Sequence, residues 1–280
     1  MKILSIESSG HVASTALIED EILRAEFTIN NGMTHSETLM PMLSEMMSLC
    51  GEDIKDVDAI AVSAGPGSFT GLRIGAATAK GLGLALGRPL IAISVLESLA
   101  FNLYNSHGAV ICPIMDARRG QVYHAAFRDG IRLLPDAAGP MDELIDKLNA
   151  MDEREYIFLG DGVPVYRELI TERLRGSYVF ATAENNLQRA ASAAQLGMWI
   201  YRRWLVENGL SAEEVRKMDL SEIKCFNDKV MDPDDFVPSY IRKPQAEREM
   251  EAGLLEDPGL HSLKKMNGER HGRRHKADKG

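Results

Sequence analysis

The chain has 280 residues, of which 41 are acidic and 32 basic, and its formal net charge is -9. This length predicts about two domains. An apolar content of 45% with 26% charged residues excludes wholesale disorder, a collagen-like chain and a disulfide scaffold. The three cysteines Cys50, Cys112 and Cys225 are widely spaced and form no Cys-x-x-Cys pair. We therefore expect a reduced, cytoplasmic protein, and no membrane span, because charged residues interrupt the most apolar stretch, residues 81–100.

Residues 1–106 predict an N-terminal lobe. Apolar residues in this part either alternate, as in strands, or recur near helical spacing. In chain order the predicted elements are strands 2–7, 12–18 and 22–29, helix 36–50, strand 57–63, helix 69–86, strand 90–94 and helix 95–105.

Residues 107–245 predict a C-terminal lobe with the same order of elements. They are strands 109–116, 121–127 and a short strand near Ile131, helix 141–151, strand 156–160, helix 165–174, strand 178–181 and helix 187–208, followed by a polar extension with several prolines. The order strand-strand-strand-helix-strand-helix-strand-helix, used twice, predicts a two-lobed α/β fold. It resembles the plan of the actin, Hsp70 and sugar-kinase (ASKHA) superfamily, a likeness that does not by itself give function.

Residues 246–280 lack the apolar pattern of a core, and we expect a basic, disordered tail. Residues 261–280 hold seven Lys/Arg and two Asp/Glu, a net charge of +5, so the other 260 residues carry -14. An acidic body is not typical of a nucleic-acid-binding protein, whereas the basic tail could touch nucleic acid.

The most specific motif is the Gly-rich segment 63–75, Ser-Ala-Gly-Pro-Gly-Ser-Phe-Thr-Gly-Leu-Arg-Ile-Gly. It has neither the third glycine of a Rossmann loop nor the Gly-Lys-Ser/Thr end of a P-loop. The segment is predicted to join a strand to a helix, and Ser68 or Thr70 could cap that helix. The free N–H groups there could hold an anion, but a loop that only makes a tight turn would explain the same residues.

The helix after this loop has a row of small residues. Gly71, Gly75, Ala79, Gly83 and Gly87 recur every four residues. Three interior glycines cost roughly 3 kcal/mol relative to alanine. Close approach of another backbone would offset this cost, and that backbone could belong to the chain's own sheet or to a helix of another subunit. The preceding helix is rich in Met, which suits adaptable interfaces.

Two turns could contact a phosphate or another anion. In the first turn, residues 7–10, Glu7 stands where a shorter Asp would be expected to hold a metal-bound water. The second turn, within residues 116–123, is filled by Arg118 and Arg119, which could bind an anion or point outward at a partner. The candidate anion contacts are Glu7, Ser8, Ser9, Gly67, Ser68, Asp116, Arg118 and Arg119.

No catalytic or metal-binding residue is predicted. His35, His107 and His124 are isolated in the sequence. Nothing gathers a nucleophile with a base and a group that orients the base.

Together these residues resemble the TsaB family. The likeness rests on residues 65–75 above all, with support from residues 6–9, His35, residues 116–123 and residues 238–242, and it covers residues 1 to about 245. It implies a non-catalytic subunit that pairs with the related catalytic subunit TsaD. TsaD binds a metal and transfers threonylcarbamoyl from an adenylate to N6 of adenosine 37 in tRNAs that read codons beginning with A. The ATPase TsaE joins the pair.

The resemblance also implies where partners and cofactors belong. ATP and a metal are expected in the partner subunits and not in this chain, and tRNA is expected to be met through the complex. Pairing with TsaD, and self-association of the isolated chain, are expected through the helices after the first strands. The interface candidates are His35, Leu39, Met42, Leu43, Met46, Gly71, Leu72, Gly75, Ala79, Leu82 and Gly83. Val95 and Leu99 stand where the catalytic relative carries metal-binding histidines, and neither can ligate a metal.

Two other functions fit the same fold. An active ATPase or phosphotransferase needs a small phosphate turn in each half and a carboxylate for Mg²⁺. Glu7 and Asp116 are the candidate carboxylates, and the two arginines argue against this function. A metallopeptidase needs a set of metal ligands, and none is predicted.

Overall fold

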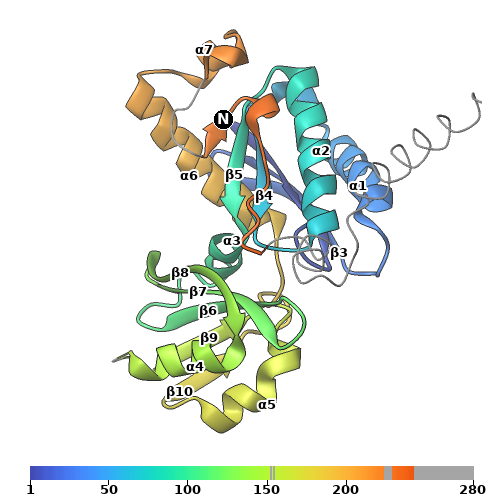
Figure 1. Ribbon diagram of the computed structural model, residues 1–280. Coiled ribbons are helices and arrows are strands. Elements are labelled where there is room, and N and C mark those ends of the chain that lie inside the picture. Colours follow the sequence, from blue (N-terminus) through green and yellow to red (C-terminus); the bar gives the residue numbers. More distant parts are fainter. Residues whose placement is uncertain (152, 154, 224–228, 243–280) are drawn as a thin grey trace, which may run out of the picture. The chain divides into compact units, whose positions relative to one another are not determined.

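The computed structural model describes residues 1–151, 153, 155–223 and 229–242 (Figure 1). Residues 1–241 make up one structural unit, whose fold is given below. The basic tail expected at residues 246–280 lies outside the described residues.

The predicted order of elements is confirmed in both halves. The first half contains β1 (Lys2–Glu7), β2 (Ala13–Glu19), β3 (Ile22–Ile29), α1 (His35–Cys50), β4 (Ala59–Gly65), α2 (Phe69–Leu86), β5 (Leu90–Ser94) and α3 (Val95–Phe101). The second half contains β6 (Val110–Asp116), β7 (Gln121–Arg128), β8 (Ile131–Pro140), α4 (Met141–Ala150), β9 (Glu155–Leu159), α5 (Val163–Arg173), β10 (Ser177–Phe180) and α6 (Ala190–Asn208). A short helix α7 (Ala212–Val215) and a short strand β11 (Val230–Met231) follow.

The first sheet has the strand order β11-β5-β4-β1-β2-β3. Its central strand β1 pairs antiparallel with β2 and parallel with β4. Side chains along β1 alternate between two apolar cores, with Leu4 and Ile6 on one face and Ile3 on the other. Strands that are apolar on both faces are typical of a sheet covered by helices on both sides.

Helices α1 and α2 cover one face of this sheet. Their apolar sides supply Leu39, Met46 and Ala79 to a core that also includes Leu4 and Ile60 of the strands. α1 begins at a capping box in which Thr34 and Glu37 exchange hydrogen bonds, an arrangement that satisfies N–H groups at a helix start.

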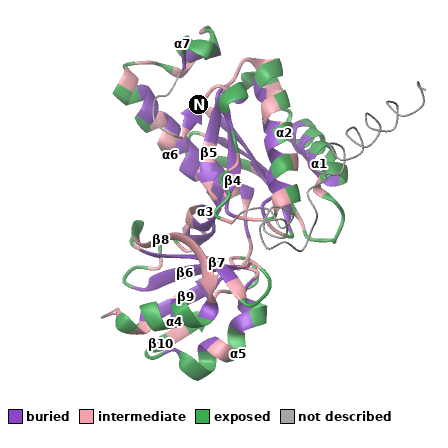
Figure 2. Cartoon of the chain, viewed as in Figure 1, coloured by how far each residue is buried: buried purple, intermediate pink, exposed green. Residues whose placement is uncertain are grey.

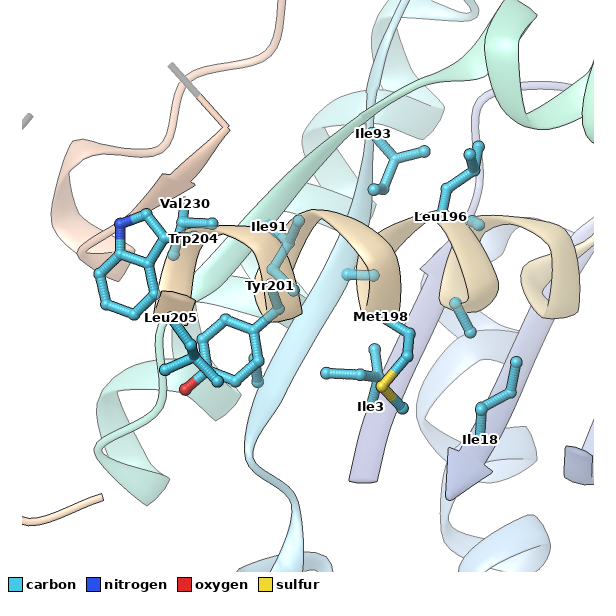
Figure 3. Packing of buried hydrophobic residues seen from close by; sticks show 14 of the residues in the cluster. Ile3, Ile18, Ile91, Ile93, Leu196, Met198, Tyr201, Trp204, Leu205 and Val230 are labelled. Atoms are coloured by element: carbon cyan, nitrogen blue, oxygen red, sulfur yellow. The ribbon is translucent and has the colours of Figure 1, made fainter. Parts of the chain in front are cut away.

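Helix α6 covers the opposite face of the same sheet (Figure 3). Its residues Met198 and Tyr201 pack with Ile3 and Ile91 of the strands. The helix comes close to the sheet because Gly197 has no side chain. A Cβ atom at that position would lie 2.8 Å from the Cβ atom of Ala61.

The second sheet has the strand order β10-β9-β6-β7-β8. β6 pairs antiparallel with β7 and parallel with β9, as β1 does with β2 and β4 in the first sheet. Helices α4 and α5 cover one face through residues such as Leu144 and Ile170. Helix α3 supplies Leu99 to the core on the other face, where it meets Ile111 and Phe127. The duplicated plan is that of the two-lobed ASKHA fold.

The division into lobes at residue 106 does not follow the packing, and this part of the prediction needs correction. Helix α3 was expected within residues 1–106, yet its apolar side joins the core of the second sheet. Helix α6 was expected within residues 107–245, yet it covers the first sheet. Each helix follows a strand of one sheet and buries its apolar side against the other. The ranges 1–106 and 107–245 therefore mark where the order of elements repeats, but they do not mark which residues share a hydrophobic core.

The segment after α6 was expected to be a polar extension, but it returns to the first sheet. Val230 of β11 pairs antiparallel with Ile91 of β5, so that β11 becomes the edge strand of the first sheet. Phe236 is buried in the core beneath α1 and α2. The backbone N–H of Ser239 donates a hydrogen bond of 2.6 Å to the carbonyl oxygen of Ala64. This packing was not predicted from the sequence, because only a few apolar residues of the segment take part in it.

Two elements differ in length from their predictions. β8 has ten residues where only a short strand near Ile131 was expected. Its content of Ala, Gly and Pro weakens the sequence pattern of a strand, and Pro135 is tolerated because β8 is an edge strand. α3 ends at Phe101 and not at residue 105.

Burial follows the layers of the fold. Figure 2 shows buried residues in the central strands and on the sides of the helices that face the sheets. Within residues 1–151, 153, 155–223 and 229–242, no helix is both long and apolar enough to cross a membrane.

Candidate functional site

The first candidate phosphate turn is closed by the chain's own Gly-rich loop. The turn between β1 and β2 lies directly against the start of α2. The N–H of Ser68 donates a hydrogen bond of 2.7 Å to the carbonyl oxygen of Ser9. The hydroxyl of Ser8 donates one of 2.9 Å to the carbonyl oxygen of Gly71. The N–H of Ser68 is thus engaged within the chain and is not free to bind a phosphate in this structure.

The glycines allow the turn to lie this close to the helix, because they have no side chain in the way. A Cβ atom on Gly67 would lie closer than 3.0 Å to the carbonyl oxygen of Ser9, and one on Gly71 would lie as close to that of Ser8. A Cβ atom on Gly75 would meet the hydroxyl oxygen of Ser8 in the same way. The backbone that approaches the glycine row is therefore the chain's own, which is one of the two alternatives that the sequence left open.

Glu7 is wholly buried at the end of β1 and is held by hydrogen bonds from its neighbours. One carboxylate oxygen accepts from the N–H of Ser9 over 2.6 Å and also from the Ser9 hydroxyl. The other accepts from the hydroxyl of Ser63 on β4. Burial raises the pKa of the Glu7 carboxyl, while these hydrogen bonds oppose the shift. The side chain thus ties β1 to its own turn and to β4.

The second candidate turn lies on the other sheet, between β6 and β7. Asp116 accepts a hydrogen bond of 2.8 Å from the N–H of Arg118, and its own N–H donates one of 3.0 Å to Asp161. Burial raises the pKa of the Asp161 carboxyl, and the hydrogen bond from the Asp116 N–H opposes this shift. Arg118 and Arg119 are exposed, and their φ values of 62° and 56° lie in the left-handed region of the backbone.

The structure groups the predicted anion contacts by turn. Glu7, Ser8, Ser9, Gly67 and Ser68 come together at the first turn, where they bind one another. Asp116, Arg118 and Arg119 belong to the second turn.

Most of the predicted interface side chains are in the protein's own core, which corrects the expectation for them. The residues buried in this way are Leu39, Met42, Leu43, Met46, Gly71, Leu72, Gly75, Ala79 and Gly83. Leu82 is half-buried against the same core, and His35 lies beside the first turn, with its Nε2 3.0 Å from the carbonyl oxygen of Gly10. A larger residue at position 75 would disrupt the fold, because its Cβ atom would meet the hydroxyl oxygen of Ser8.

The outward sides of α1 and α2 carry exposed apolar residues that are not among the predicted interface residues. Met40 and Leu49 on α1 are 47% and 70% exposed, and Leu84 on α2 is 53% exposed. Ala77 and Gly81 are also exposed on α2, and a Cβ atom on Gly81 would meet nothing within 4 Å. The outer sides of the two helices therefore combine large apolar side chains with small residues.

Sequence reasoning missed these exposed residues although a signal was present. Ala77, Gly81 and Ala85 form a second row at intervals of four along the same helix. The two rows look alike in the sequence, and only the position of the sheet decides which one is buried.

The positions of the expected lost metal site are apolar and inaccessible. Val95 and Leu99 on α3 are 0% exposed and belong to the core between α3 and the second sheet. In the part of the chain that the structure describes, no group of three or more His, Cys, Asp or Glu side chains is arranged to hold a metal ion.

Comparisons with known proteins agree with this architecture. Residues 29–250 match the family model of TsaD, tRNA N6-adenosine threonylcarbamoyltransferase. The tRNA threonylcarbamoyladenosine biosynthesis protein TsaB of Bacillus subtilis is 33% identical over 201 residues, which are 70% of this chain and 87% of that protein. The protein of the same name from Haemophilus influenzae is 30% identical over 190 residues, 63% of this chain and 79% of its own length.

Solved structures show the same fold. The structure of YeaZ from Pseudomonas aeruginosa aligns with a TM-score of 0.58 at 25% identity, covering 76% of this chain and 97% of that one. A second Pseudomonas aeruginosa structure, described as an uncharacterized protein with similarity to peptidase YeaZ, aligns with a TM-score of 0.64 at 23% identity over 86% and 99% of the two chains. By its match to the family model and its identity to curated members over most of their length, the chain belongs to the TsaB family.

Proposed function

We propose that this chain acts in the biosynthesis of threonylcarbamoyladenosine in tRNA, as the non-catalytic subunit of a complex with a TsaD-type enzyme. Its relatives are named for this pathway. In this proposal the partner transfers the threonylcarbamoyl group to adenosine, and this chain supplies a binding surface. ATP and a metal belong to the TsaD-type and TsaE-type partners, and tRNA is met through the complex.

The observation that carries the proposal is the closed first turn. A phosphotransferase of this fold needs free backbone N–H groups at the turn after β1. Here the N–H of Ser9 donates to the Glu7 carboxylate, which the Ser63 hydroxyl also holds, and the N–H of Ser68 donates to the carbonyl oxygen of Ser9. Opening the site for a phosphate would require breaking these bonds. This argues against the alternative, an active ATPase or phosphotransferase.

The outer sides of α1 and α2 are the proposed contact with the TsaD-type partner. The exposed Met40 and Leu84 supply apolar area, and Ala77 and Gly81 allow another helix to approach closely. In the absence of the partner, we expect a second copy of the chain to cover the same surface and form a homodimer. Burial of apolar area drives both associations.

The test measures complex formation by light scattering, with the TsaD-type subunit of the same organism and with the chain alone. We expect a heterodimer to replace a homodimer, and tRNA modification to appear only in the mixture. Ala77→Glu and Leu84→Glu should weaken the heterodimer at least about tenfold, because each would bury a charge in an apolar contact.

Val206→Glu is the matched control, because Val206 is an apolar residue that is 81% exposed on α6, on the other face of the sheet. Equal weakening by all three variants would contradict the proposed surface. ATP hydrolysis by the chain alone, with no response to the TsaD-type subunit, would favour the phosphotransferase instead.

A further inference from the structure

Three aromatic side chains form an open cluster away from the surface discussed above. Phe101 ends α3, Tyr104 follows it, and Trp199 lies on α6. The ring centroids are 4.9 Å apart for Phe101 and Tyr104, 5.1 Å for Phe101 and Trp199, and 5.4 Å for Tyr104 and Trp199. Tyr104 is 39% exposed and Trp199 is 40% exposed. Large rings that pack edge to face and still meet water are typical of binding surfaces.

Two hollows adjoin this cluster and share its three rings. One has a volume of about 250 Å³ and reaches the turn between β7 and β8, with Asp129 and Ile131 in its wall. The other has a volume of about 490 Å³ and reaches Glu21. Ile131 is 67% exposed and adds apolar surface at the rim of the first hollow.

The charged side chains that line the two hollows are all acidic. They are Glu97 and Asp129 in the first hollow and Glu21 in the second. Glu97 accepts from Arg132 over 3.0 Å, and Glu21 pairs with Arg202 over 2.5 Å.

Asp129 differs from Glu97 and Glu21 in that its ion-pair partner is a histidine and not an arginine. It lies 3.6 Å from the Nδ1 atom of the exposed His107 and accepts a 3.4 Å hydrogen bond from the N–H of Gly108. Its side chain is 49% exposed. A carboxylate has about four acceptor positions, so a further donor fits.

An arginine that contacts both a ring and a carboxylate already occurs beside the first hollow, whose lining includes Phe127 and Glu97. The guanidinium of Arg132 lies 4.6 Å from the ring centroid of Phe127 while it pairs with Glu97. Arginine suits such a place because its planar group stacks on rings and donates to carboxylates at the same time.

We propose that the Phe101–Tyr104–Trp199 cluster binds an arginine side chain presented by an extended segment of a partner protein. The guanidinium would stack on Tyr104 or Trp199 and pair with Asp129, and neighbouring apolar side chains of the segment would cover Ile131. Charge complementarity selects this occupant, because the Asp129 carboxylate attracts a guanidinium and repels the phosphate backbone of RNA. Trp199 is on α6, and α6 covers the face of the first sheet opposite α1 and α2. The site is therefore distinct from the proposed TsaD-type interface and does not depend on that proposal.

The test uses the fluorescence of the full chain, which has two tryptophans. Trp204 is 2% exposed, so a ligand at the cluster should change the emission of Trp199. The probes are a blocked Ala-Arg-Ala tripeptide and its counterpart with citrulline, which has the shape of arginine without its charge. We expect a saturable change with the arginine peptide at up to about 10 mM, several-fold weaker binding of the citrulline peptide, and no change in Trp199→Phe.

Asp129→Asn isolates the charge with little risk to the fold, because Asn tolerates the φ of 49° found at this residue. This variant should bind the arginine peptide at least about threefold more weakly. Asp146→Asn, an exposed aspartate on α4, should bind as the wild type does. Equal binding of the two peptides, no effect of Asp129→Asn, or a response only to an RNA oligonucleotide would each overturn the proposal.

Discussion

The carbonyl oxygen of Ser8 lies where a side chain on Gly71 would have to begin. A Cβ atom on Gly71 would come closer than 3.0 Å to that oxygen, and the hydroxyl of Ser8 also donates to the carbonyl oxygen of Gly71. The turn after β1 therefore packs directly against the first turn of α2, and this is possible because residue 71 has no side chain. This relationship brings the turn against the helix and explains why the helix has glycine at positions 71 and 75.

Gly71→Ala should therefore destabilise the protein. The added methyl group meets backbone, which cannot turn away as a flexible side chain can, so we expect a loss of about 1–3 kcal/mol in the free energy of unfolding. Gly81→Ala is the matched control in the same helix, because its Cβ atom would meet nothing within 4 Å. That variant should gain up to about 1 kcal/mol from the higher helix propensity of alanine. Urea unfolding of both variants measures this, and equal effects would contradict the fit.

Glu7→Gln should change how stability depends on pH. Because burial raises the pKa of Glu7, the folded protein keeps a proton that the unfolded chain has lost. The stability contributed by the protonated carboxyl is fully present below the unfolded pKa of about 4.5 and is lost as the pH rises through the folded pKa. Gln stays neutral and can still accept from Ser9. The unfolding free energy of Glu7→Gln should therefore rise relative to the wild type as the pH increases above about 4.5. A difference independent of pH would refute this.

His124→Leu should show the opposite dependence. His124 on β7 is 3% exposed, and burial lowers its pKa from 6.5 to about 4, with Lys147 adding to the shift. The neutral ring contributes stability that is fully present above pH 6.5 and is lost as the pH falls toward 4. Between these values the wild type should lose up to about 3 kcal/mol relative to His124→Leu. Urea unfolding of both proteins at a series of pH values measures the difference, and parallel pH curves would rule out His124 as the cause.

Local sequence patterns were enough to predict the elements. The alternation around Leu4 and Ile60, and the glycine C-caps at Gly51 and Gly87, mark strands and helices through forces that act within a few residues. These patterns predicted the duplicated order of elements and hence the two-sheet α/β fold. They failed for β8, where Pro135 and small residues are accepted because an edge strand leaves one side unpaired.

Sequence alone determined the family and the order of elements, because the motif at residues 65–75 and the local patterns are properties of short segments. Only the tertiary structure decided which surface each helix buries. In the structure, Gly71 and Gly75 face inward and contact Ser8, whereas Ala77 and Gly81 are exposed. The two rows look alike in the sequence. The tertiary structure also brought the ring of Trp199 on α6 against that of Phe101 on α3. Both outcomes depend on contacts between segments far apart in the chain, and local spacing does not encode such contacts.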